Sequence, residues 1–385
     1  MDITNILGLL GGLALFLHGM QMMSSGLEAA AGNRMKGILE KLTANRLLGI
    51  LVGAVITAVI QSSSATTVMV VGFVNSGMMT LRQAVWIIMG ANIGTTITGQ
   101  LIALDVGVLA PLFAFIGVAM MVFLKKPQSH HFGSIIGGLG VLFIGMDMMS
   151  ASMAPLREMP GFVSLMTTFS NPVIGILAGA LFTAVIQSSS ASVGILQALS
   201  STGLVTFGSA IPIILGAHIG TAFTPLLTIG GSSKDGKRAA FIHLYFNVVG
   251  SVTMLALIYA VQALFGVLPW DDVMTKSSIA NIHTLSSVAA MLLLLPFSGL
   301  LLRLSQLTVP STKEEVQELS MPVLDDRLFK SPAVALKQAK SAVVRMGGRA
   351  ARNVGLATPL LVQMDEDTVS AIDLRENLID RMEVE

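Results

Sequence analysis

Two short polar sequences stand inside long apolar runs, and their residue types suit the binding of a small anion. They form two tetrads: Gln61, Ser62, Ser63 and Ser64, and Gln187, Ser188, Ser189 and Ser190. Each tetrad offers hydroxyl and amide donors but no fixed positive charge. If the helix breaks at a tetrad, the unpaired backbone N–H groups of the following half-helix add partial positive charge at the same place. We therefore expect both tetrads to hold an anion.

A second pair of polar sequences begins 29 residues after each glutamine, at Gly90 and at Gly216. In both, glycines flank an asparagine or a histidine and threonines follow, a composition that favours unwinding of the helix. Unwound carbonyls and threonine hydroxyls supply the oxygen shell that Na⁺ prefers. His218 takes the place that Asn92 has in the first sequence, and it is either a ligand or a buried hydrogen-bonded residue.

The chain repeats itself at a fixed spacing. Residues 49–65 and 175–191 agree at 14 of 17 positions with an offset of 126, and the same offset joins residues 87–95 to 213–221. A lone hydroxyl in a helix usually bonds back to its own backbone, and duplication for packing alone is the simplest alternative. The repeat, however, preserves its polar residues best. Because polar groups inside a membrane are expensive, this conservation between the two copies favours a functional role.

Composition places most of this sequence in a membrane. The 385 residues are 53% hydrophobic and 12% charged, whereas soluble domains carry about 25% charged residues. Residues 303–385 hold 24 of the 45 charges, which predicts a water-facing tail. A net charge of +1 excludes a general nucleic-acid binder, and the lack of cysteine excludes disulfides and thiolate chemistry. No catalytic or metal-ligand spacing is present, so we expect neither an enzyme nor a cofactor.

Two apolar runs are too long for a single membrane span. Residues 47–81 would form a helix of about 52 Å, and residues 172–205 are similarly long. Each run has a tetrad at its middle, so we expect two half-length helices that fold back as a re-entrant hairpin. Backbone that unwinds at this depth must be buried in protein or line a wet cavity. Runs of ordinary span length lie at 5–23, 83–104, 107–124, 132–150, 208–230, 239–268 and 279–302.

Treating both long runs as hairpins makes the distribution of basic residues consistent. With the N-terminus outside, eleven Lys and Arg residues fall on the inner side, and only Arg157 and Lys276 on the outer side. This asymmetry is what the positive-inside rule predicts, and it places the tail in the cytoplasm. Residues 24–46 are too charged to span, so we expect them to lie along the inner interface. The first apolar run is expected to be retained as a span.

The repeat predicts an inverted architecture. Each unit holds one span, one hairpin and two further spans, and an odd number of crossings turns the second unit upside down. Inverted repeats of this kind are typical of secondary transporters. The predicted fold is an all-α integral membrane protein with two inverted-topology repeats, each with a re-entrant helical hairpin, an extra span and a cytoplasmic helical tail. The predicted division is 1–126 and 127–268 for the two repeats, 269–305 for the additional transmembrane helix and 306–385 for the tail.

The paired tetrads and the sequences Gly90–Thr98 and Gly216–Thr224 resemble the two signatures of the type II sodium–phosphate cotransporter family, over residues 5–305. The resemblance implies sodium-coupled transport of inorganic phosphate. It places both tetrads around the substrate and ions, and it adds these residues: Asn92, Thr95, Thr96, Thr98, Thr221 and Thr224. His218 stands where the family usually has asparagine, and it is kept as a candidate.

The same resemblance implies phosphate and Na⁺ as transported partners, contact with lipid, and the bacterial inner (cytoplasmic) membrane as the location. A homodimer is one assembly compatible with it. Two alternatives stay open: transport of another oxyanion or a dicarboxylate, and a membrane phosphate sensor that signals through the tail.

The tail carries a likeness of its own. Residues 331–381 have an amphipathic helical pattern, and residues 375–385 resemble the start of the PhoU-type helical domain that follows many bacterial members. This implies a PhoU-like domain that is cut short at Glu385, joined by a linker that contains Pro310 and Pro322.

Overall fold

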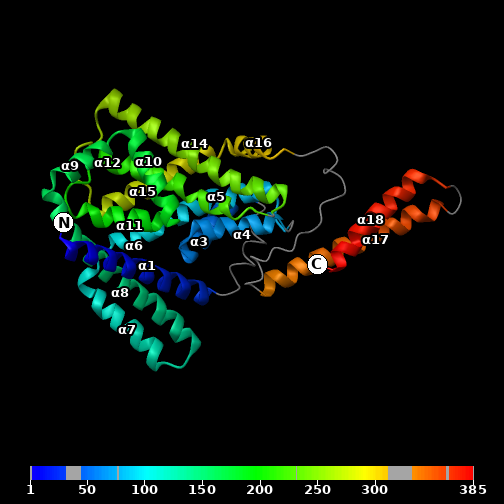
Figure 1. Cartoon of the computed structure of the whole chain (residues 1–385), viewed down its shortest axis with the longest axis horizontal. Helices are drawn as coiled ribbons and strands as arrows, with labels where there is room; N and C mark the ends of the chain where they lie inside the picture. Colours follow the sequence, from blue (N-terminus) through cyan, green and yellow to red (C-terminus); the bar gives the residue numbers. More distant parts are fainter. Residues whose placement is uncertain are drawn as a thin grey trace.

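The computed structural model describes residues 2–31, 45–75, 78–230, 232–310, 332–360 and 364–384, and within them every regular element is a helix. The first half contains α1 (Ile3–Ala31), α3 (Arg46–Ile60), α4 (Ser63–Asn75), α5 (Leu81–Gly94), α6 (Thr96–Ala103), η1 (Gly107–Leu109) and α7 (Ala110–Phe123). The second half contains α8 (Pro127–Met153), η2 (Ala154–Glu158), α9 (Pro160–Thr168), α10 (Pro172–Ile186), α11 (Ser189–Ser200), α12 (Phe207–Thr221), α13 (Phe223–Leu227) and α14 (Lys234–Phe265). They are followed by α15 (Lys276–Leu294), α16 (Ser298–Thr308), α17 (Pro332–Leu360) and α18 (Glu366–Val384). Figure 1 shows α1 to α16 gathered into one helical body.

Both long apolar runs break at their tetrads. Gln61 ends α3 at φ 60° and ψ 20°, and Gln187 ends α10 at φ 58° and ψ 26°. Few residues other than glycine adopt this left-handed conformation, so both breaks are sharp and local. The predicted break at each tetrad is confirmed, and neither run forms one continuous helix.

The same local contacts recur 126 residues apart. Thr57 Oγ1 donates to Thr66 Oγ1 at 2.9 Å beside the first break, and Thr183 Oγ1 donates to Ser192 Oγ at 2.8 Å beside the second. These hydroxyl pairs join the two half-helices on either side of a break. The starts of α3 and α10 also differ by 126 residues, as do the starts of α4 and α11.

Close backbone contacts hold α3 against α5 and α10 against α12. A Cβ at Gly90 would lie 1.9 Å from the carbonyl oxygen of Ile50, and one at Gly216 would lie 2.2 Å from that of Ile176. No residue larger than glycine fits at either position without moving a helix. These contacts fix each tetrad, at the end of α3 or α10, relative to the polar sequence on the next helix.

The first helix of each unit packs against its equivalent. A Cβ at Gly12 would lie 2.9 Å from the carbonyl oxygen of Gly145, and one at Gly19 would lie 2.6 Å from that of Gly138. Moving along α1 therefore means moving backward along α8, so the two helices are antiparallel. The offset of 126 exchanges the two contacts, because Gly12 corresponds to Gly138 and Gly19 to Gly145.

The predicted unwinding at the second pair of polar sequences is wrong. Only one residue separates the helices at each place, Thr95 between α5 and α6 and Ala222 between α12 and α13, and both residues keep right-handed helical backbone angles. The Thr95 N–H still bonds to the carbonyl of Ala91 at 3.1 Å, so the hydrogen-bond ladder continues through the glycines. Unwound carbonyls are therefore not presented at these two places.

The first span is longer than predicted. α1 runs to Ala31, so residues 24–31 continue this helix instead of forming a separate interfacial segment. The rest of the predicted interfacial segment, residues 32–44, lies outside the described residues.

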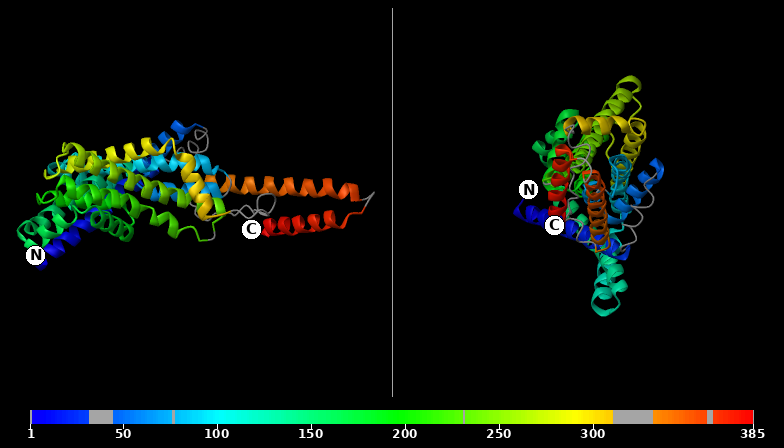
Figure 2. Two further views of the ribbon diagram at one scale, coloured as in Figure 1. Left: turned by 90° about the horizontal axis from the view of Figure 1, so that it is seen from above. Right: turned by 90° about the vertical axis from the view of Figure 1, so that its right-hand side faces the viewer.

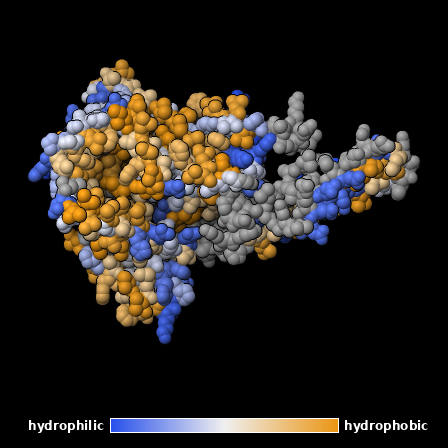
Figure 3. Space-filling view, viewed as in Figure 1, coloured by the Kyte–Doolittle hydropathy of each residue, from blue (hydrophilic) through white to orange (hydrophobic). Residues whose placement is uncertain are grey.

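Six helical stretches among the described residues are long and apolar enough to cross a membrane, and a seventh is possible if α9 and α10, bent by 103°, count as one span. The stretch Gly107–Phe123, predicted as a span, is shorter than these. Large apolar side chains cover the outside of the body: Phe115 is 71% exposed, Phe123 78% and Leu181 70%. Figure 3 shows hydrophobic residues over much of one face. Such a surface is suited to lipid and not to water.

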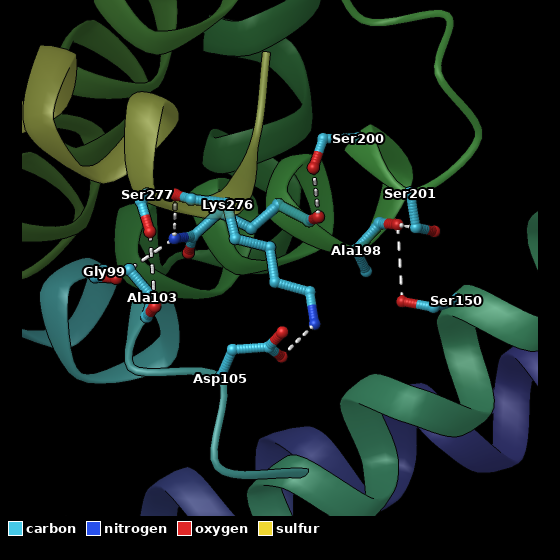
Figure 4. A network of polar contacts seen from close by, with 10 residues as sticks. Gly99, Ala103, Asp105, Ser150, Ala198, Ser200, Ser201, Lys276 and Ser277 are labelled. Carbon is cyan, nitrogen blue, oxygen red and sulfur yellow. Dashed lines mark hydrogen bonds and ion pairs between the residues drawn. The ribbon is translucent and has the colours of Figure 1, made fainter.

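A polar network ties the second tetrad's helix to its neighbours (Figure 4). Gln197 of α11 donates from Nε2 to the carbonyl oxygens of Gly99 at 3.0 Å and Lys276 at 2.9 Å, which links α6 and α15. Lys276 Nζ lies 2.6 Å from Asp105 Oδ1. The start of α15 is thereby held against the end of α6.

The region predicted as one additional helix contains two. Residues 295–297, which include Pro296, separate α15 from α16, because proline lacks the N–H that would continue the helix. The tail forms two helices, α17 and α18, that lie side by side and extend away from the helical body (Figure 2). The predicted linker falls mostly on residues 311–331, outside the described residues, and the PhoU-like character of the tail stays a prediction.

Replacing Gly90 with alanine is expected to destabilise the protein by about 1–3 kcal/mol, because the new Cβ forces α3 and α5 apart. The measurement is the melting temperature of the purified protein in detergent. Gly299→Ala is the matched control, since its Cβ meets nothing within 4 Å and alanine is the better helix former. Equal melting temperatures for Gly90→Ala and the unmodified protein would contradict the proposed close packing.

Candidate functional site

A cavity of about 460 Å³ lies between the two tetrads. All eight tetrad residues contribute to its wall, together with Thr95 at the end of α5. The remaining polar wall comes from α1: Gln21, Ser24, Ser25 and Glu28. Segments 126 residues apart in the chain thus face one space.

The starts of α4 and α11 turn backbone donors toward this cavity. The first N–H groups of a helix have no acceptor inside the helix. The Ser62 hydroxyl accepts from the N–H of Ala65 at 3.1 Å, and the Ser188 hydroxyl accepts from that of Ala191 at 3.2 Å. Within the described part of the chain, the amides of residues 63, 64, 189 and 190 have no acceptor, and these residues line the cavity. Two helix N-termini that meet at one cavity can bind an anion without a cationic side chain.

The two tetrad glutamines are in different states. Gln61 is buried, and its Oε1 accepts a hydrogen bond from Thr98 Oγ1 at 2.7 Å. Its equivalent Gln187 is exposed to the cavity. The equivalent of Thr98 is Thr224, whose buried hydroxyl has no hydrogen-bond partner among the described residues. The first glutamine is therefore latched to α6 by this hydrogen bond, and among the described residues the second has no equivalent bond.

One contact crosses between the repeats inside the site. Thr95 Oγ1 lies 3.4 Å from Ser190 Oγ, and both residues are buried. The end of α5 in the first unit therefore touches the tetrad of the second unit. This contact links the two units directly at the cavity.

The cavity wall offers neutral hydrogen-bond donors and one carboxylate. Glu28 of α1 lines the wall, and no Lys or Arg does so among the residues that the structure describes. A bare phosphate dianion would meet no fixed counter-charge there, and the Glu28 carboxylate would oppose it. The described residues also contain no group of three or more His, Asp or Glu that could hold a metal ion.

The other predicted site residues do not reach this cavity. Asn92 and His218 line a separate small pocket. Thr96, at the start of α6, donates to the carbonyl of Ile93 at the end of α5, and Thr221 donates to that of Ala217 within α12. The pattern predicted from the sequence thus divides into tetrads and Thr95 at the cavity, and later residues around it.

The sequence motifs missed the α1 wall of the cavity. Gln21, Ser25 and Glu28 are exposed residues on a helix that is otherwise apolar in composition. One signal was available, because Gln21 matches Asp147 at the same offset of 126 and both are polar. Asp147 itself is exposed and does not line the cavity.

Comparison with known proteins identifies a matching family and relatives from bacteria. The family described as Na+/Pi-cotransporter matches residues 15–151 and 159–298. The chain is 26% identical over 345 residues to "Putative inorganic phosphate export protein YjbB" of Salmonella typhimurium, covering 89% of this chain and 63% of that protein. It is 30% identical over 297 residues to "Uncharacterized protein YqeW" of Bacillus subtilis, covering 77% of this chain and 95% of that protein.

A shorter stretch matches a human protein. Over 105 residues the chain is 40% identical to "Sodium-dependent phosphate transport protein 2B", covering 26% of this chain and 15% of the human protein. No solved structure matches the chain significantly.

The family match includes both tetrads and the part of α1 that lines the cavity, and it extends over more than half of the chain. The long apolar helices found among the described residues, six or up to seven, mark an integral membrane protein. The chain therefore belongs to the Na+/Pi-cotransporter family.

Proposed function

We propose that this protein is a sodium-coupled secondary transporter of inorganic phosphate. The observation that carries the proposal is the cavity of about 460 Å³ in which both tetrads meet. The free amides at the starts of α4 and α11 and the serine hydroxyls would bind the phosphate oxygens. The name of the human relative, a sodium-dependent phosphate transport protein, supports this choice over other oxyanions.

Coupling to sodium follows from the charge of the site. Neutral donors and the Glu28 carboxylate leave a bound phosphate without a counter-ion among the described residues. A sodium ion that enters with the phosphate supplies that charge, so each solute raises the affinity for the other. In this proposal Thr95 and the tetrad residues near it provide oxygen ligands for Na⁺.

The two states of the glutamines support alternating access. In the proposed orientation the N-terminus is outside, the α3–α4 and α10–α11 pairs are re-entrant hairpins of two inverted repeats, and the tail is cytoplasmic. The cavity is lined by the second half of α1, from Leu17 to Glu28, so it opens toward the cytoplasm. The observed conformation is then inward-facing, with Gln61 latched to Thr98. In the outward-facing state Gln187 would latch to Thr224 instead.

The direction of transport is a separate point. An inward Na⁺ gradient drives uptake, but the name of the Salmonella relative favours phosphate export as a second candidate. Flux measurements with phosphate placed either inside or outside the same vesicles distinguish export from uptake.

Phosphate flux in proteoliposomes is expected to depend on the Na⁺ gradient, because the anion lacks a counter-ion otherwise. Radiolabelled phosphate uptake should collapse when choline replaces external Na⁺. Gln61→Ala and Gln187→Ala should abolish uptake while the protein still elutes as a folded species. Arsenate should compete, whereas sulfate and succinate should not. Full uptake by both glutamine variants, or uptake without Na⁺, would dismiss the proposed site.

A cysteine at Ser25 is expected to react with a membrane-impermeant maleimide from the cytoplasmic side only, since Ser25 lines the cavity. The chain has no native cysteine, so each labelled variant has a silent background. Ser277→Cys is the matched control, because this exposed residue at the start of α15 is expected on the outer side. Labelling is compared between right-side-out and inverted vesicles, and the reverse pattern would overturn the orientation.

Thr98→Val is expected to disfavour the inward-facing state, because it removes the hydroxyl that holds Gln61. Loss of a hydrogen bond worth about 0.5–1.5 kcal/mol lowers the equilibrium constant for the inward-facing state roughly two- to tenfold, so a Ser25→Cys reporter should be labelled more slowly. Thr224→Val removes a hydroxyl that has no described partner in this state, so the rate should stay the same or rise. Equal slowing by both variants would show that the two threonines do not mark opposite states.

A further inference from the structure

A second pocket lies where four helices meet behind the tetrad cavity. It is lined by residues of α5, α12, α14 and α15, and it shares no lining residue with the cavity. Its polar wall consists of Asn92, His218, Asn247, Ser251 and Ser287. The volume of about 10 Å³ is close to the room that one water-sized sphere needs. The pocket is therefore a site for a single small particle.

The two asparagines present oxygen, and not nitrogen, as their free atom. Asn92 Nδ2 donates to the Ile88 carbonyl at 2.9 Å, and Asn247 Nδ2 donates to the His243 carbonyl at 2.8 Å. Only the amide nitrogen can donate to a carbonyl, so both side-chain orientations are determined. Neither Oδ1 accepts a hydrogen bond within the described part of the chain.

The hydroxyls of Ser251 and Ser287 likewise keep free oxygen lone pairs. Ser251 Oγ donates to the Leu215 carbonyl at 2.8 Å, and Ser287 Oγ donates to the His283 carbonyl at 2.9 Å. Each hydroxyl has one proton, which is thereby used, and its oxygen lone pairs remain. His218 Nε2 lies 3.4 Å from Ser287 Oγ, and because the serine proton is already engaged, the imidazole N–H is the donor in this contact.

We propose that this pocket binds one sodium ion through the side-chain oxygens of Asn92, Asn247, Ser251 and Ser287. The four residues are almost completely buried. Both hydroxyl protons and one N–H of each amide are bonded to backbone carbonyls, so each residue keeps oxygen lone pairs for a particle in the pocket. A shell of neutral oxygens is what a hard monovalent cation prefers. A water molecule would satisfy only two of these acceptors with its two hydrogens.

The charge of the pocket restricts the ion. No carboxylate lines the pocket within the described residues, so a divalent cation would keep two uncompensated charges in a buried place. The neutral ligands thus suit a monovalent cation, and sodium is the one that the proposed function supplies.

The inference deepens the proposed function, because it gives a coupling ion a place away from the tetrads. Asn92 lies on α5, one turn before Thr95, which reaches the phosphate cavity. His218 on α12 is the equivalent of Asn92 in the second repeat, 126 residues later. An ion that holds α5 to α14 and α15 would therefore stabilise one relative position of the repeats.

The test measures sodium binding to the purified full chain without phosphate. Equilibrium binding of radioactive Na⁺ and the rise in melting temperature with Na⁺ are followed, with choline keeping the ionic strength constant. We expect Ser251→Ala and Ser287→Ala each to weaken Na⁺ binding about tenfold, the effect of losing one polar partner of a charge.

Ser305→Ala is the matched control, since this buried serine of α16 donates to the Leu302 carbonyl at 2.8 Å but lies outside the pocket. It should bind Na⁺ like the unmodified protein. Gln187→Ala should lose phosphate flux and keep the Ser251-sensitive Na⁺ binding, which separates the pocket from the tetrads. Two serine variants are measured so that the test remains decisive if one of them does not fold.

Two outcomes decide the question. Unchanged Na⁺ affinity in folded Ser251→Ala and Ser287→Ala would mean that the pocket holds water only, even if flux remains sodium-dependent. Ser251-sensitive Na⁺ binding without sodium-dependent flux would keep the pocket and dismiss the transport coupling instead.

Discussion

An interrupted helix inside an apolar body must satisfy its backbone polar groups, and the rest of this structure is arranged around that constraint. The breaks at Gln61 and Gln187 free the first amides of α4 and α11. The Ser62 and Ser188 hydroxyls accept from the amides of Ala65 and Ala191, and the two breaks share one cavity, where water or a ligand can satisfy the remaining amides. Under the proposed function, these remaining amides form the anion site. Glycines at Gly90 and Gly216 bring the supporting helices close enough to keep this geometry.

Two copies of one local structure do not have to be in the same state. The tetrads share sequence, backbone angles and capping contacts, yet only Gln61 has its threonine partner. The unsatisfied Thr224 hydroxyl marks a bond that the same sequence can make and that this conformation lacks. Buried hydroxyls without partners are costly, so such a group is a natural place for a second conformation to gain stability. Under the proposed function, the exchange of one latch for the other is the structural difference between the two access states.

The sequence predicted those features that local chemistry decides. The helical class, the breaks at the tetrads and the grouping of eight tetrad residues followed from span length and from the repeat at an offset of 126. Features that depend on tertiary packing did not follow. Glycines around Asn92 indicated unwinding, but the tight packing of Gly90 on Ile50 explains them better. The α1 wall with Glu28 and the different states of Gln61 and Gln187 depend on contacts between distant segments, which identical local sequences cannot distinguish.

A transporter site must release what it binds, and the chemistry here fits that requirement. A fixed Arg or Lys would hold phosphate strongly in either state, because its charge cannot leave. If the protein transports phosphate as proposed, neutral donors would hold the anion weakly by themselves, and the Glu28 carboxylate would weaken its binding further. Binding would then be strong only while a mobile cation is present. Under the proposed function, the oxygen-lined pocket around Asn247 extends the same logic, since sodium held there by neutral ligands can also leave. The absence of fixed positive charge from the cavity wall, within the described residues, is in this view the source of coupling.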